Sequence, residues 1–182
     1  MSRRTPARTR LVTTAARLFR ERGYHGVGLI EILAQAKAPK GSMYYAFPEG
    51  KADLALAAAD HATIGLLAVI TASFETAETW AEGLAAYCEA LAGEFEAGAT
   101  TCPVGPLLFD GPENEAFREK LDNVFGRWIR AIAYQAIRLD EDEETAEERA
   151  EELLIALQGA WILARARGRA DAIRALAVRF SA

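Results

Sequence analysis

The stretch from Val27 to Lys51 constrains the fold most, because it predicts two short helices with a tight break between them. The first helix is expected over 29–36, where four apolar residues recur at the spacing of one helical face: Leu29, Ile32, Leu33 and Ala36. Pro39 interrupts this pattern, since proline lacks an amide donor and biases the residue before it away from helix. Proline suits a first helical position, so a second short helix is expected from about Pro39 to Phe47.

The second helix is too short to be stable alone, so other parts of the protein must hold it. It offers one cation, one glycine whose backbone is uncovered by a side chain, one hydroxyl and two phenols: Lys40, Gly41, Ser42, Tyr44 and Tyr45. Such groups suit phosphate oxygens and base edges, and two short helices joined by a tight turn form the helix-turn-helix of DNA-binding proteins. Spacing alone also permits a plain connector between core helices, with Met43, Tyr44 and Phe47 packing inward.

Four short motifs occur in order in and around these helices: Gly23-Tyr24, Ile32-Leu33-Ala34, Lys40-Gly41-Ser42-Met43-Tyr44-Tyr45-Ala46-Phe47-Pro48 and Gly50-Lys51. They resemble the N-terminal domain of TetR-type transcriptional regulators over about Thr9 to Leu56. The Ala-Pro-Lys-Gly-Ser form, followed by Phe-Pro-x-Gly-Lys, is similar to the LmrA/YxaF-like branch. The resemblance implies a DNA-binding domain over residues 1–50, with double-stranded operator DNA contacted by eight residues: Gly28, Pro39, Lys40, Gly41, Ser42, Tyr44, Tyr45 and Lys51.

Two positions depart from the pattern that the resemblance implies. Gly28 stands where the family usually has Thr or Ser as the N-cap of the first short helix; glycine is weaker there by a few tenths of a kcal/mol. Ala46 stands where a histidine often precedes the phenylalanine, so one phosphate contact is expected to be missing.

The charge distribution supports a nucleic-acid partner for the N-terminal quarter. Residues 1–51 carry ten Lys and Arg and three acids, a net charge of +7, whereas residues 52–182 carry a net charge of -12. A basic region on an acidic chain is the electrostatic pattern of a polyanion-binding domain.

The composition predicts an all-α protein. Apolar residues make up 51% of the chain and prolines number six, while Ala, Leu, Glu and Arg, which favour helices, are abundant. Outside the two short helices, we expect one helix before the break, a short proline-rich segment and five longer helices in a body over residues 51–182. These elements are Pro6–Arg22, Lys51–Phe74, Thr79–Ala97, Cys102–Asp110, Glu113–Leu139, Thr145–Arg167 and Ala170–Phe180.

Aromatic and apolar stripes run along the helices of the body. Alone they are typical of an ordinary solid core, but the family resemblance favours a cavity among them for a small apolar or aromatic effector. The residues expected to line it are His61, Ile64, Trp80, Tyr87, Leu108, Phe125, Trp128 and Trp161. His61 lies on an apolar stripe, which favours a core or cavity role over metal binding.

The last two helices have wide apolar faces and could either complete one core or pair with a second copy of the chain. Palindromic DNA favours the second arrangement, a homodimer joined by a four-helix interface. Its expected contacts are Leu154, Leu157, Trp161, Ile173 and Leu176.

Several other function classes are disfavoured. We expect no secretory signal, because Thr9 to Arg22 is charged throughout, and no membrane span, because the most apolar stretch, Ala62–Thr71, is only about ten residues long. Cys88 and Cys102 are interpreted as buried thiols in a reducing cytoplasm. The two histidines and two cysteines assemble no convincing nucleophile and base, and no metal or cofactor is expected.

The sequence therefore predicts a cytoplasmic, ligand-responsive DNA-binding regulator that acts as a homodimer, in the role of a repressor. The main alternative is a helical carrier of apolar molecules whose basic N-terminal region is incidental. A helical-bundle enzyme is a weaker alternative.

Overall fold

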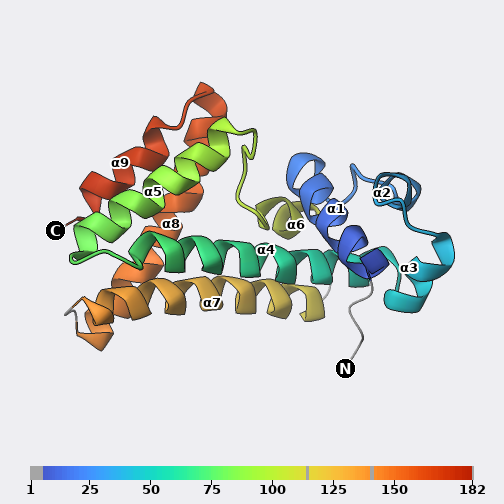
Figure 1. The fold of residues 1–182 in the computed structure, drawn as a ribbon, viewed down its shortest axis with the longest axis horizontal. Coiled ribbons are helices and arrows are strands. Elements are labelled where there is room, and N and C mark those ends of the chain that lie inside the picture. The colour runs from blue at the N-terminus through green and yellow to red at the C-terminus, as the bar shows by residue number, and fades with distance from the viewer. Residues whose placement is uncertain (1–5, 114, 140–141, 182) are drawn as a thin grey trace. The chain divides into compact units, whose positions relative to one another are not determined.

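The computed structural model describes residues 6–113, 115–139 and 142–181, and over these residues every regular element is a helix (Figure 1). The all-α fold predicted from composition is therefore confirmed. The helices are α1 (Pro6–Arg22), α2 (Leu29–Gln35), α3 (Lys40–Ala46), α4 (Lys51–Phe74), α5 (Trp80–Glu96), α6 (Gly105–Asp110), α7 (Glu115–Arg138), α8 (Glu143–Arg167) and α9 (Asp171–Arg179).

The chain forms two compact units. The head unit comprises Met1–Thr63 and Pro103–Val124, and the body unit comprises Ile64–Cys102 and Phe125–Ala182. The head unit thus includes α6 and the first part of α4, which lie beyond residue 50, where the sequence analysis placed a domain boundary.

The head unit is built on α1, which packs against α2, α3 and α6. Apolar residues at helical spacing fill its centre: Leu11, Ala15, Leu18 and Phe19 from α1, Ile32 from α2, Met43 from α3 and Leu54 from α4, each at most 2% exposed. The two seven-residue helices are held by this packing, because helices of two turns are not stable alone.

The break between α2 and α3 has a defined geometry. The amides of Lys37 and Ala38 donate to the carbonyl oxygens of Ala34 and Leu33, which is the Schellman pattern at a helix C-terminus. Lys37 has a φ of 48°, in the left-handed region where glycine is the usual residue. The chain then enters α3 through the extended backbone of Pro39.

In the body unit, α9 packs against both α5 and α8. Helix α5 begins with a capping box, in which the Thr79 hydroxyl accepts from the amide of Glu82 and the Glu82 carboxylate accepts from the amide of Thr79. Arg174 of α9 bonds to the carboxylates of Glu89 and Glu96 on α5, at 2.8 and 2.6 Å. The core contains Phe74, Leu84, Tyr87, Leu91, Trp128, Ile132 and Trp161.

Helix α4 corrects one expectation. The most apolar stretch was expected to be about ten residues long, yet α4 has 24 residues and, within the described chain, is the one helix long and apolar enough to cross a membrane. The expectation of no span considered only Ala62–Thr71, whereas α4, which was predicted with the bounds observed, continues through Asp60 and His61. Length and composition alone are weak grounds for a span, and α4 buries Leu54, Ala58 and Ile70 inside the protein.

Candidate nucleic-acid interface

Helix α3 buries one side and presents the other. Met43 and Phe47 are buried against the head unit, whereas Tyr45 is 88% exposed and Tyr44 is 49% exposed. Lys40 and Gly41 are also exposed. The inward packing expected of a plain connector thus occurs at Met43 and Phe47, while the expected DNA-contacting side chains lie on the outer face.

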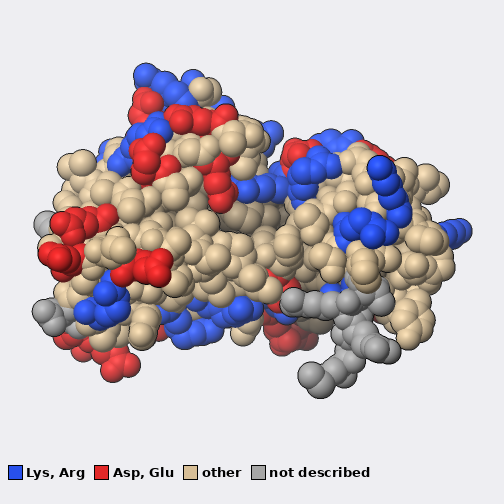
Figure 2. Space-filling view, viewed as in Figure 1, with Lys and Arg blue, Asp and Glu red and all other residues tan. Residues whose placement is uncertain are grey.

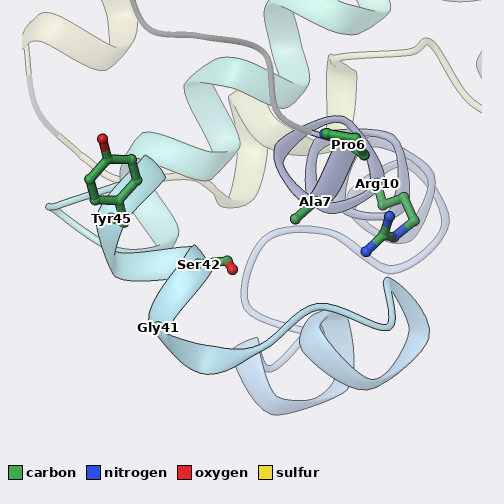
Figure 3. A pocket seen from close by; sticks show the side chains of 6 residues that line it. All are labelled: Pro6, Ala7, Arg10, Gly41, Ser42 and Tyr45. Carbon is green, nitrogen blue, oxygen red and sulfur yellow. The ribbon is translucent and has the colours of Figure 1, made fainter.

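An open pocket of about 510 Å³ lies between the exposed side of α3 and the start of α1. Gly41, Ser42 and Tyr45 line one wall, and Ser42 projects from α3 towards α1 (Figure 3). The opposite wall consists of Pro6, Ala7 and Arg10. A hydroxyl, a phenol and a guanidinium around an open depression are the groups that hydrogen-bond to phosphate oxygens.

Arg10 is a candidate site residue that the sequence analysis missed. Its Nε donates to the carbonyl oxygen of Ala36 at 2.9 Å, and its Nη2 donates to that of Lys37 at 3.2 Å. The available signal was an arginine early in the first helix, but its partners lie 26 and 27 residues away and depend on the tertiary fold.

Lys51 is the first residue of α4, and its Nζ lies 4.2 Å from the centre of the Tyr24 ring. Partial burial lowers the pKa of Lys51 from its ordinary value, and the negative charge of Asp110 opposes that shift. A lysine at a helix N-terminus adds its charge to the positive end of the helix dipole, which suits a phosphate.

The two remaining expected DNA contacts are backbone positions at helix starts. Gly28 is the N-cap of α2 and Pro39 is the N-cap of α3; both are exposed and neither offers a side-chain cap. Lys and Arg side chains are prominent on the visible face of the head unit, whereas the visible face of the body unit carries patches of both signs (Figure 2).

The residues expected to line a ligand cavity divide into two groups. Trp80, Tyr87, Trp128 and Trp161 are buried in the body unit and Phe125 is half-buried, whereas His61, Ile64 and Leu108 are exposed. The Trp80 indole N–H already has a partner within the protein, because Nε1 donates to the carbonyl oxygen of Phe180 at 2.6 Å.

The residues expected to form the dimer interface are packed inside the protomer. The side chains of Leu154, Leu157, Trp161, Ile173 and Leu176 are at most 5% exposed. The exposed apolar residues on α8 and α9 are others, chiefly Ile155, Ile162 and Val178. The sequence pattern could not separate these sets, because α8 is rich in apolar residues on more than one face.

Two sequence profiles match the chain. The profile described as "Bacterial regulatory proteins, tetR family" matches residues 11–58, and the profile "Transcriptional regulator LmrA/YxaF-like, C-terminal domain" matches residues 80–179. The first covers the helix-turn-helix and the start of α4. The second covers more than half of the chain.

Characterised and uncharacterised regulators also resemble the chain. The HTH-type transcriptional regulator LmrA of Bacillus subtilis is 33% identical over 125 residues, which span 67% of this chain and 66% of LmrA, just under two thirds of that protein. The uncharacterised regulator YxaF of the same organism is 30% identical over 151 residues, covering 81% of this chain and 79% of YxaF.

A solved structure has a similar fold. The TetR regulatory protein from Rhodobacter sphaeroides superposes with a TM-score of 0.81 and 26% identity, covering 97% of this chain and 98% of that one. These relatives are transcriptional regulators and not enzymes. The chain therefore belongs to the TetR family of DNA-binding helix-turn-helix transcriptional regulators, in its LmrA/YxaF-like branch.

Proposed function

We propose that this regulator is a cytoplasmic, homodimeric repressor that leaves its operator when a small apolar or aromatic molecule binds its body unit. The observation that carries the DNA half of this proposal is the exposed side of α3, where Tyr44, Tyr45 and Lys40 project from a helix anchored by buried Met43. An anchored short helix with an exposed polar face is the form of a recognition helix in the major groove.

The head unit supplies both kinds of contact that such a helix needs. The pocket beside α3, with Ser42 and Arg10 at its walls, suits a backbone phosphate. Tyr44 and Lys40 lie close together, with the Lys40 Nζ 6.0 Å from the ring centre, and both are free to approach base edges. Lys51 would contact a second phosphate at the start of α4.

The effector proposal draws on two buried donors in the body unit. The Tyr87 hydroxyl and the Trp128 indole N–H are buried without a hydrogen-bond partner among the described residues. An unpaired buried donor costs about 1–3 kcal/mol, so an effector that carries an acceptor oxygen on an aromatic or apolar frame would gain affinity there. Burial raises the pKa of Tyr87 far above its ordinary value, which keeps the phenol protonated as a donor.

The dimer proposal uses the exposed apolar residues of the last two helices. Ile155 and Ile162 are seven residues apart on α8, which places them on the same face, and they are 66% and 65% exposed. Val178 on α9 is 81% exposed. A second copy of the chain is the occupant that a symmetric operator requires, since its half-sites lie about 34–36 Å apart or a multiple of that.

Selection of bound DNA from a random pool tests the function directly. The proposal expects a sequence with two-fold symmetry, bound by a dimer with strong salt dependence. A binder found by quenching of tryptophan fluorescence should then lower the affinity for that DNA, and by linkage the DNA should lower the affinity for the binder equally.

The same measurements separate the proposal from the alternative of an apolar-ligand carrier. A carrier would bind apolar compounds with no selected DNA sequence and with little dependence on salt. Binders that leave DNA affinity unchanged would support DNA binding but contradict the ligand-released repressor.

A further inference from the structure

The C-terminal residue of α6 bonds to the turn that joins α1 and α2. The backbone amide of His25 donates to Oδ2 of Asp110 at 2.7 Å, across 85 positions of sequence. Both residues belong to the head unit, and α6 packs against α1. The neutral amide thus gains a charged acceptor, a stronger kind of hydrogen bond than one between neutral groups.

The same carboxylate lies against Gly23 in this turn. Gly23 has a φ of 74°, and a Cβ atom added there would lie 2.6 Å from Asp110 Oδ2. Glycine is therefore required twice, once by the left-handed backbone and once by the approach of the carboxylate. Asp110 thus contacts the turn at Gly23 and at His25, the residues before and after Tyr24.

Tyr24 connects this turn to the proposed phosphate contact at the start of α4. Its ring contacts the Phe19 ring at 5.7 Å between centres and the His25 ring, edge to face, at 5.2 Å. The Nζ of Lys51 lies over the Tyr24 ring at 4.2 Å. A cation within about 6 Å of a ring face is held by the ring's quadrupole, so the position of Tyr24 sets the position of Lys51.

We propose that Asp110 is a positioning residue for DNA binding: it fixes the Gly23–His25 turn, and through Tyr24 it orients Lys51 towards a DNA phosphate. This inference rests on the proposed function of the head unit. It also makes α6 a structural part of the DNA-binding unit although α6 lies far from it in sequence. Anything that shifts α6 would then alter the affinity for DNA.

A positioning role and a purely electrostatic role of Asp110 predict different results. The negative charge of Asp110 also repels DNA. If that charge were its whole effect, a variant without the charge would bind DNA more tightly, and a variant that keeps the charge would bind like the parent. Asp110→Asn keeps an acceptor oxygen for the His25 amide but removes the charge. Asp110→Glu keeps the charge but moves the carboxylate by one methylene, into the space beside Gly23.

The decisive measurement is the operator affinity of the 182-residue protein at several salt concentrations, by fluorescence anisotropy. We expect Asp110→Asn to bind within about twofold of the parent, or more tightly, and Asp110→Glu to bind about tenfold more weakly, as expected from loss of one charged contact. The salt slope of Asp110→Glu should be shallower by about 0.9, as for one lost phosphate contact.

A double-mutant cycle with Lys51→Ala tests the route through Lys51. If Asp110 acts through Lys51, adding Asp110→Glu to Lys51→Ala weakens binding by no more than about twofold further. Full additivity, or Asp110→Glu with the affinity of the parent, would overturn the inference. Glu49→Gln, which removes an exposed acid from the loop before α4, reports the effect of charge alone.

Circular dichroism and thermal melting confirm that each variant is folded before its DNA affinity is interpreted. If Asp110→Glu is unfolded, Asp110→Ala serves instead, and it should bind more weakly than Asp110→Asn although both have lost the same charge. Equal affinity of the Ala and Asn variants would overturn the inference. Failure of the parent itself to bind any selected DNA would refute the proposed function, a separate and recognisable outcome.

Discussion

Arg10 in α1 donates a hydrogen bond from Nε to the carbonyl oxygen of Ala36, 2.9 Å away, at the C-terminal end of α2. Its Nη2 donates to the next carbonyl, that of Lys37. The carbonyl oxygens at the end of a helix have no hydrogen-bond partner within the helix. Arg10 therefore supplies donors to two carbonyl oxygens, those of Ala36 and Lys37, at the break before α3. The first helix thereby holds the turn of the helix-turn-helix in shape.

We expect Arg10→Ala to lower the stability of the protein by roughly 1–2 kcal/mol, because two hydrogen bonds to a charged donor are lost. Chemical denaturation measures this loss. Arg17→Ala is the matched control, since Arg17 lies in the same helix and its bonds within the described residues go to the exposed side chains of Glu21 and Gln35. This substitution should cost less than about 0.5 kcal/mol. Equal losses in the two variants would contradict the structural role of Arg10.

Neither backbone conformation nor packing against the described residues requires glycine at Gly41 in α3. Its φ is not in the left-handed region, and a Cβ added there would meet no atom of the described residues within 4 Å. Glycine in a helix is less favourable than alanine by about 0.5–1 kcal/mol, so Gly41→Ala should stabilise the free protein by about that amount. The same methyl group should weaken DNA binding, because it occupies the pocket wall beside Ser42.

Gly93 provides the matched control for this prediction. It is an exposed glycine inside α5, also with open space around its Cβ position, but it lies in the body unit. Gly93→Ala should raise the melting temperature similarly and leave DNA affinity unchanged. A Gly41→Ala variant with the DNA affinity of the parent would remove residue 41 from the interface.

Tyr87→Phe should leave the ligand-free protein as stable as the parent or stabilise it by about 1 kcal/mol. The variant removes a buried hydroxyl that has no partner in the described part of the chain, together with the cost of burying it. Thermal melting measures the change, and Tyr134→Phe, at an exposed tyrosine, should be neutral. A loss above about 1 kcal/mol would show that the hydroxyl has a stabilising partner, and would weaken the case for an effector that binds there.

Ile162→Glu should give folded monomers, because it places a carboxylate on the exposed face of α8 that we propose joins two copies. Leu157→Glu should instead unfold the protomer, since Leu157 is buried inside it and an unpaired buried carboxylate is very costly. Light scattering combined with circular dichroism distinguishes the two outcomes. A dimeric Ile162→Glu variant would place the interface elsewhere.

Local sequence patterns were sufficient for most of the fold. Pro6, Gly23 and the prolines around α3 mark helix boundaries through backbone chemistry, so α1 and α4 were predicted with the bounds observed. The exposure of Tyr45 and the burial of Met43 also follow from helical periodicity.

The contacts that join distant segments could not be predicted from local patterns. The bonds of Arg10 to Ala36 and of Asp110 to His25 depend on where α1 and α6 lie in the folded head unit. The apolar residues of α8 face in several directions, and only the packing of α8 against α9 shows that Leu157 is inside and Ile162 outside. Periodicity identifies apolar faces but does not say which of two faces meets the protomer's own core.

The ion pairs of Arg174 make one further prediction, for the dependence of stability on pH. Hydrogen bonds from this guanidinium lower the pKa of both Glu89 and Glu96 in the folded protein. A lowered carboxyl pKa stabilises the fold above the unfolded value of about 4.3, and the contribution is lost as pH falls through the folded pKa values.

Stability should therefore decline as the pH falls below about 5, and Arg174→Gln should reduce that decline, because both carboxylates then regain pKa values nearer to those of the unfolded chain. All three side chains are exposed, so high salt should also reduce the difference in unfolding free energy between the parent and Arg174→Gln. Denaturation curves at pH 7 and pH 3.5, each at low and high salt, measure both effects. At pH 3.5 the two proteins should differ less than at pH 7, since a protonated glutamate no longer attracts the arginine; an equal difference at both pH values would show that Arg174 stabilises α9 through packing and not through its charge.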